Sequence, residues 1–266
     1  LIVGGQAAAI QSQLSYSRDM EREADRVGYG VMSEAGFDPQ GFVGMFGKLQ
    51  QAAGLNDNGA YPYLRSHPLT TERIADMQSR VQLNAAPAPK AVDVEQAMLS
   101  ARARVLSQGH VDAWRASTQT SPANLPQATL ASKAGVWYGA TLAHVLLKDF
   151  AAADRSLQNL ERLVSGQSAP ARLAKLLRAE VAAAQGRWDA VPGLLASQGK
   201  GLKLERPELI ATAQALLHTQ APEARAKVLD QLRERVQAYP LDAQAWNTLA
   251  NLLAAQGHAL PSLRAE

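Results

Sequence analysis

An internal repeat in the second half of the chain constrains the fold more than any other feature. The segment "VWYGATLAHVLLKDFAAADRSLQNL" (136–160) places small and aromatic residues at fixed helical spacings, and "LLRAEVAAAQGRWDAVPGLL" (176–195) repeats that order. Phe150 and Trp188 occupy the corresponding aromatic position, 38 residues apart. A unit of this length buries its apolar face only against a neighbouring unit, so the recurrence predicts stacked pairs of helices.

A third segment, "YPLDAQAWNTLANLLAAQG" (239–257), shows the pattern most clearly. Its key positions are Pro240, Trp246, Leu249, Ala250, Leu253 and Gly257. The three segments resemble tetratricopeptide (TPR) repeats, in which small residues let two helices approach closely and an aromatic side chain fills the gap to the next pair. We therefore expect four to five helical hairpins over residues 92–266, with an unrelated helical bundle as the alternative. A TPR-type array presents a concave face suited to peptides or partner proteins.

The composition favours an all-α fold and excludes several classes of function. Aromatic residues are only 5% of the chain while alanine and leucine are abundant, which is typical of packed helices. The chain has no cysteine, so disulfides and thiolate–zinc sites are excluded. Its net charge of +3 is mild and its basic residues are scattered, so we expect no nucleic-acid partner. No run of 18 apolar residues occurs, and we expect no membrane span.

The first third of the chain has a different organisation. A helical pattern over about residues 6–35 ends at Gly36, and Asp38 is placed to cap a second helix with Pro39 at its first position. The apolar stripe of that second helix, which we expect to form a core, consists of Phe42, Met45, Phe46 and Leu49. Another helix follows, capped by Thr70 or Thr71.

An alanine- and proline-rich stretch, "NAAPAPKAV", is the clearest break in composition. We therefore divide the chain into residues 1–84, a linker at 85–91 and a helical repeat domain at 92–266.

Four carboxylates alternate along "RDMEREAD" near the start of the chain. On a helix Glu21 and Asp25 are one turn apart and share a face, whereas Glu23 points roughly the opposite way. Two neighbouring acids on one face are tolerable at a solvated surface. The residues by themselves leave both a solvated face and a metal site open.

The longer phrase "SRDMEREADRVG" resembles the second signature of the HtpX/BepA-like zinc metallopeptidases, a gluzincin group. That group carries H-E-x-x-H on one helix and E-x-x-x-D on a later one, and the second motif matches Glu21 to Asp25 here. The similarity extends to "GFDPQGFVGMFGKLQ" and "YLRSHPLTTERIADM". The periplasmic BepA-like branch also has a C-terminal TPR array. The resemblance thus covers nearly the whole chain. It implies that residues 1–84 are the C-terminal part of a metallopeptidase domain.

This resemblance implies roles for four residues. Glu21 would be the third protein ligand of a catalytic Zn²⁺, which keeps its fourth position for a water molecule. Asp25 would orient a ligand histidine. His67, in Ser66-His67-Pro68, would either stabilise the oxyanion or occupy the open coordination position. Arg73 would pair with substrate or with a carboxylate of the site.

The remaining polar groups are assigned no catalytic role. We expect Asp19 and Glu23 to be solvated, and we expect packing or surface positions for the histidines of the repeat region, which are His110, His144, His218 and His258.

One half of the family's metal site is missing from these 266 residues, which contain no H-E-x-x-H. We expect that motif upstream of Leu1 in a longer parent protein that binds Zn²⁺. We expect the present chain to bind no zinc and to be inactive alone. The apolar start "LIVGGQAAAIQSQ" would then be exposed, and we expect self-association or disorder of residues 1–20.

Two functions remain open at this point. The first is the C-terminal part of a periplasmic zinc endopeptidase of envelope quality control, whose repeats dock outer-membrane assembly machinery or misassembled substrates. The second is a TPR adaptor or chaperone-like module that binds proteins without cleaving them.

Overall fold

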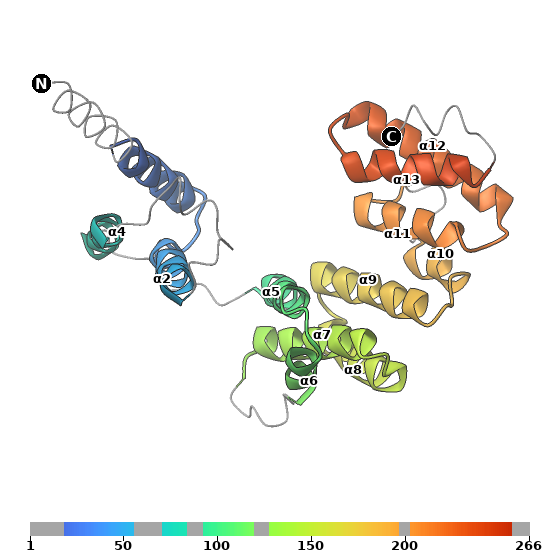
Figure 1. Ribbon diagram of the computed structural model, residues 1–266, viewed down its shortest axis with the longest axis horizontal. Helices are drawn as coiled ribbons and strands as arrows, with labels where there is room; N and C mark the ends of the chain where they lie inside the picture. Colours follow the sequence, from blue (N-terminus) through green and yellow to red (C-terminus); the bar gives the residue numbers. More distant parts are fainter. Residues whose placement is uncertain (1–18, 56–70, 84–92, 120–127, 197–202, 257–266) are drawn as a thin grey trace, which may run out of the picture. The chain divides into compact units, whose positions relative to one another are not determined.

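The computed structural model describes residues 19–55, 71–83, 93–119, 128–196 and 203–256. Within these ranges every regular element is a helix, and the chain divides into two compact units, residues 1–91 and 92–266 (Figure 1). The all-α class predicted from composition is therefore confirmed for the described residues. None of the helices there is long and apolar enough to cross a membrane.

The first unit contains a helix whose described part covers residues 19–34, followed by α2 (Gln40–Leu55) and α4 (Thr71–Leu83). The first helix ends because Gly36 adopts a left-handed conformation, with a φ of 77°. The Phe37 N–H closes that turn by donating to the Met32 carbonyl at 3.1 Å. Asp38 Oδ1 then accepts a hydrogen bond from the Gln40 N–H at 2.9 Å. Both turn residues act as predicted.

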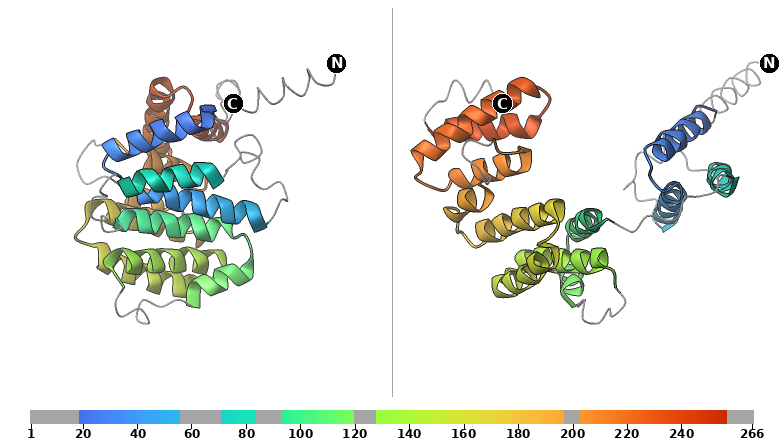
Figure 2. Two further views of the ribbon diagram at one scale, coloured as in Figure 1. Left: turned by 90° about the vertical axis from the view of Figure 1, so that its left-hand side faces the viewer. Right: turned by 180° about the vertical axis from the view of Figure 1, so that it is seen from behind.

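The core of this unit lies between its three helices, whose ribbons can be followed in the left view of Figure 2. Its buried residues are Tyr29, Phe46, Ile74, Met77 and Val81, with Phe42, Val43 and Leu49 packed against them. The prediction was wrong for Met45, whose side chain is 47% exposed. Positions 42, 46 and 49 follow the i, i+4, i+7 spacing of one helix face, and Met45 lies at the edge of that face.

The second unit consists of helices in sequence. They are α5 (Val94–Ser107), α6 (Val111–Gln119), α7 (Leu130–Leu146), α8 (Phe150–Val164), α9 (Ser168–Ala184), α10 (Ala190–Leu195), α11 (Arg206–Leu216), α12 (Pro222–Ala238) and α13 (Ala243–Ala254). From α5 to α13, each odd-numbered helix contacts the next odd-numbered one, and each even-numbered helix packs on its predecessor. The described part of this unit is thus four helical hairpins followed by α13 (Figure 1).

Two turns within these hairpins have the same geometry, 38 residues apart. Lys148 follows α7 with a φ of 61°, and Gly186 follows α9 with a φ of 76°. In both, the next residue's N–H donates to the carbonyl five positions back, from Asp149 to His144 and from Arg187 to Ala182, each at 2.9 Å. The recurrence seen in the sequence therefore corresponds to a recurring turn, although Lys148 occupies a conformation that favours glycine.

Arginine–carboxylate pairs join successive odd-numbered helices. Arg172 on α9 pairs with Glu208 on α11 at 2.6 Å, and Arg206 on α11 pairs with Asp242 before α13 at 2.8 Å. Each pair spans 36 residues. Because the two oxygens of each carboxylate face a planar guanidinium, these pairs also fix the orientation of neighbouring helices.

Candidate functional site

The first helix directs Glu21, Asp25 and Tyr29 inward, because positions i, i+4 and i+8 lie on one helical face. Asp25 is 6% exposed and Tyr29 is 8% exposed. The Glu21 side chain is 13% exposed. The two carboxylates that share a face in the sequence pattern are therefore both nearly buried.

Arg73, on the first turn of α4, lies between these two carboxylates. Its Nε donates to Asp25 Oδ2 at 2.6 Å and its Nη2 donates to Asp25 Oδ1 at 2.7 Å. Its Nη1 lies 3.1 Å from Glu21 Oε2. A planar guanidinium can bind one carboxylate with two parallel bonds and still reach a second acid, which an ammonium cannot do in this geometry. The cation thereby offsets the repulsion between Glu21 and Asp25.

An aromatic side chain of α2 completes the surroundings of Arg73. The guanidinium carbon lies 5.3 Å from the centre of the Phe46 ring, a distance at which the cation is attracted to the ring face. Phe46 is only 4% exposed, so it shields the cluster from water on that side. Exclusion of water strengthens the attraction between the charges, and the Glu21 side chain is thus held in a defined position.

The other two acids of the segment lie on the surface. Glu23 accepts hydrogen bonds from Arg26 at 2.5 and 2.8 Å, and these bonds lower the pKa of Glu23. Asp19 is exposed and lies 3.6 Å from Arg22, which also reaches Glu72 on α4. The solvated positions predicted for Asp19 and Glu23 are confirmed.

The described residues include one side chain suited to bind zinc, that of Glu21, but they do not form a complete zinc site. Among them, no group of three or more His, Asp or Glu side chains comes close enough to hold a metal ion. Zinc in a catalytic site takes three protein ligands and a water molecule, and a carboxylate oxygen such as that of Glu21 is a suitable donor. His67 lies outside the described residues, as do residues 1–18 and the linker at 85–91.

The described histidines of the second unit have packing or surface surroundings. His144 is half-buried on α7, and burial lowers its pKa. His218 is exposed and stacks on Trp188, with ring centres 4.1 Å apart. His110 is also exposed, and its Nδ1 accepts from the Ala113 N–H. His258 lies outside the described residues.

Sequence reasoning left the partner of Arg73 open between substrate and a carboxylate of the site. The structure places Arg73 against two such carboxylates, Asp25 and Glu21. Arg73 and Asp25 are 48 residues apart in the chain, so helical periodicity contains no signal of their pairing.

Residues 1–81 match the model of peptidase family M48. The chain is 31% identical to a putative beta-barrel assembly-enhancing protease of Vibrio cholerae, over 58% of this chain and 31% of that protein. It is 27% identical to the beta-barrel assembly-enhancing protease of Yersinia pestis, over 96% of this chain and 50% of that protein.

The protein of that name from Escherichia coli is 34% identical over 30% of this chain and 16% of its own length. The chain thus spans half or less of the length of these relatives. Residues 1–81, which contain Glu21, Asp25 and Arg73, are similar to the M48 metallopeptidases, and this supports the predicted resemblance to HtpX/BepA-like metallopeptidases for the first unit. The TPR part of that resemblance stays a prediction.

Proposed function

We propose that this chain is part of a zinc-dependent metalloendopeptidase of bacterial envelope quality control, located in the periplasm. One observation carries the proposal. The segment that matches family M48 holds two nearly buried carboxylates one helical turn apart on a single arginine. A solvated helix face would leave these groups exposed, because burying a charge costs free energy that only a paired partner offsets. Buried, paired ionisable groups of this kind are candidates for a functional site.

Glu21 is the proposed metal ligand, offering one carboxylate oxygen to Zn²⁺. The histidine ligands and the general base would come from an H-E-x-x-H helix of the longer protein. Zinc bound in such a set supplies a water molecule of lowered pKa for attack on a peptide bond. His67, which belongs to the same matching segment, would either stabilise the oxyanion or close the open position.

Arg73 and Asp25 are proposed to position Glu21. Asp25 holds the guanidinium with both oxygens, and the guanidinium in turn contacts Glu21 Oε2. A ligand fixed in this way loses little conformational freedom when a metal binds. Each oxygen of Asp25 keeps a further lone pair, so a hydrogen bond from a ligand histidine to Asp25 stays compatible with this geometry.

The second unit is proposed to be a TPR-type array that docks protein partners, including outer-membrane assembly machinery. Its support is the succession of contacting odd-numbered helices and the recurring turn at Lys148 and Gly186. The names of the relatives, beta-barrel assembly-enhancing proteases, favour the same class of partner.

The test uses the intact natural protein and compares Glu21→Ala with Glu23→Ala. The two residues lie two positions apart on one helix, but only Glu21 faces Arg73, whereas Glu23 is exposed. We expect Glu21→Ala to lose most bound zinc and casein cleavage, and Glu23→Ala to keep both. Unchanged zinc content in Glu21→Ala would show that Glu21 is not a ligand. Absence of zinc and cleavage from the unmodified intact protein would favour a binding module instead.

A further inference from the structure

The two bonds to Asp25 hold one edge of the Arg73 guanidinium. Its Nε and Nη2 donate to the two oxygens of that carboxylate at 2.6 and 2.7 Å. Rotation of the planar group about this edge moves Nη1, the nitrogen that lies 3.1 Å from Glu21 Oε2. A contact on the face of the guanidinium resists such a rotation and thereby keeps Nη1 on Glu21.

The Phe46 ring, on α2, provides a contact of this kind. The guanidinium carbon of Arg73 lies over the ring, 5.3 Å from its centre, and a cation is attracted to the electron-rich face of an aromatic ring. Phe46 is 4% exposed, and this attraction is stronger where water is excluded. The guanidinium is thus held along its edge by Asp25 and over the ring by Phe46.

The Phe46 ring is itself held by other aromatic side chains. Phe42, one turn earlier on α2, meets it edge to face, with ring centres 5.0 Å apart and planes inclined by 64°. Phe42 in turn meets Tyr29 at 6.5 Å and 72°. Tyr29 lies on the inward face of the first helix, one turn after Asp25. Aromatic contacts therefore lead from that helix through α2 to the guanidinium of Arg73.

We propose that Phe46 is a positioning residue of the metal site, and that the face of its ring determines how tightly Glu21 binds Zn²⁺. The inference rests on the proposed function, in which Glu21 is a zinc ligand. Without the ring, Arg73 can tilt, and Glu21 occupies more orientations before the metal binds. Ordering of the ligand then costs more free energy, so zinc binds more weakly.

A purely structural role for Phe46 makes a different prediction. As a core residue beside Met77 and Val81, it stabilises the first unit by burying apolar surface. On that basis, any core substitution with the same cost in stability would affect zinc binding equally. A role through the ring face instead makes zinc affinity depend on the electron density of the ring at constant volume.

The test measures the zinc affinity of the intact natural protein by competition with a chelating dye. Phe46→Leu keeps an apolar side chain but removes the ring, and we expect zinc to bind about tenfold more weakly. Val81→Ala is the control, because Val81 is buried in the same core and lies two helical turns beyond Arg73 on α4. It should accelerate hydrogen exchange in residues 71–83 at least as much as Phe46→Leu, yet leave zinc affinity unchanged.

Fluorinated phenylalanine at position 46 separates the charge distribution of the ring from its volume. Fluorine withdraws electron density from the ring face and weakens its attraction to a cation, with little change in size. We expect zinc affinity to fall stepwise from the unmodified to the trifluorinated ring, by about threefold in all. Circular dichroism should show the same helix content throughout the series.

Three outcomes overturn the inference. They are an unchanged zinc affinity in Phe46→Leu, an equal loss in Val81→Ala, and an affinity that does not depend on fluorination. The zinc content of Glu21→Ala tests the proposed function separately. If Glu21→Ala loses its zinc while Phe46→Leu binds zinc normally, the function stands and the inference fails. If Glu21→Ala keeps its zinc, both fail.

Discussion

We expect Arg73→Met to destabilise the first unit, because Arg73 is the cation between two nearly buried carboxylates. Arg73→Met keeps much of the side-chain length and apolar contact with Phe46 but removes the charge between Asp25 and Glu21. The side chains of Asp25 and Glu21, taken without their backbone atoms, are only 8% and 13% exposed, so water cannot replace the lost partner. Removing one member of a buried ion pair costs about 3–5 kcal/mol, a large part of the typical stability of a domain.

Arg22 provides a matched control for this substitution. It also bridges the first helix and α4, because its Nη2 lies 2.7 Å from Glu72 Oε2. Its side chain is 51% exposed and that of Glu72 is 70% exposed, so an exposed pair of this kind contributes roughly 0–1 kcal/mol. Arg22→Met should therefore have little effect, although it breaks a bridge between the same two helices.

Hydrogen exchange measured by mass spectrometry reports the stability of each unit separately, because each peptide belongs to one unit. Arg73→Met should accelerate exchange in peptides covering 19–34 and 71–83 by about a hundredfold or more, up to complete loss of protection. All four tryptophans lie in the second unit, so tryptophan-monitored urea unfolding should be unchanged. Unaltered exchange of residues 19–34 and 71–83 in Arg73→Met, or an equal effect of Arg22→Met, would refute the reasoning.

Three further predictions concern the rest of the chain. Lys148→Gly should stabilise the second unit by about 0.5–1 kcal/mol in urea unfolding, because Lys148 has a φ of 61°, and a destabilised variant would contradict this. Asp242→Asn should destabilise the second unit by about 2–3 kcal/mol near pH 7, because Asp242 accepts bonds from Arg206, Arg235 and the Ala245 N–H. The Arg206 and Arg235 hydrogen bonds lower the pKa of Asp242 in the folded chain, so this stability is complete above the ordinary carboxyl pKa and is lost as pH falls below it. The two proteins should thus converge in stability in acid, and a constant difference across pH would exclude this mechanism. Finally, the 266-residue chain should show no zinc-dependent cleavage of casein, because it contains no H-E-x-x-H, and measurable zinc-dependent turnover would contradict the assignment of the missing ligands.

The sequence by itself determined the features that depend on neighbours within one or two helical turns. Helix class, the stop at Gly36 and the cap at Asp38 follow from backbone preferences, and the shared face of Glu21 and Asp25 follows from the helical period. The same reasoning separated Glu23 as a surface residue. It was wrong for Met45, since a stripe of apolar residues does not reveal where the edge of a buried face falls.

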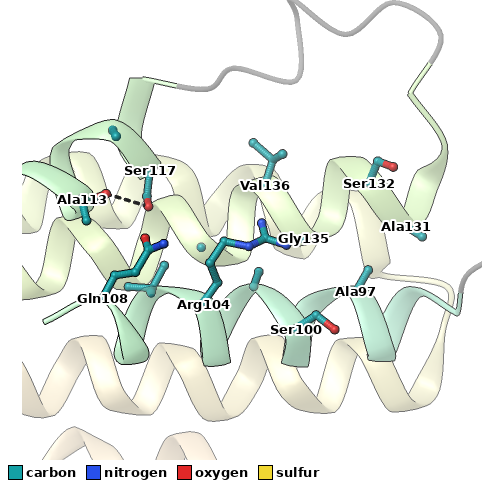
Figure 3. Close-up of a pocket in the computed structure, with 14 residues that line it drawn as sticks. Ala97, Ser100, Arg104, Gln108, Ala113, Ser117, Ala131, Ser132, Gly135 and Val136 are labelled. Atoms are coloured by element: carbon teal, nitrogen blue, oxygen red, sulfur yellow. Dashed lines mark hydrogen bonds between the residues drawn. The ribbon is translucent and has the colours of Figure 1, made fainter. Parts of the chain in front are cut away.

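Only the tertiary structure decided what lies opposite each face. Arg73 reaches Asp25 across 48 residues because α4 packs on the first helix, and Phe46 of α2 closes that cluster from a third element. Likewise, Gly135 on α7 lies against the Ala97 backbone on α5, a close approach between two helices that are separate in the sequence (Figure 3). Helical periodicity assigns a side chain to a face, but the burial of a charge and the identity of its partner depend on how separate helices pack.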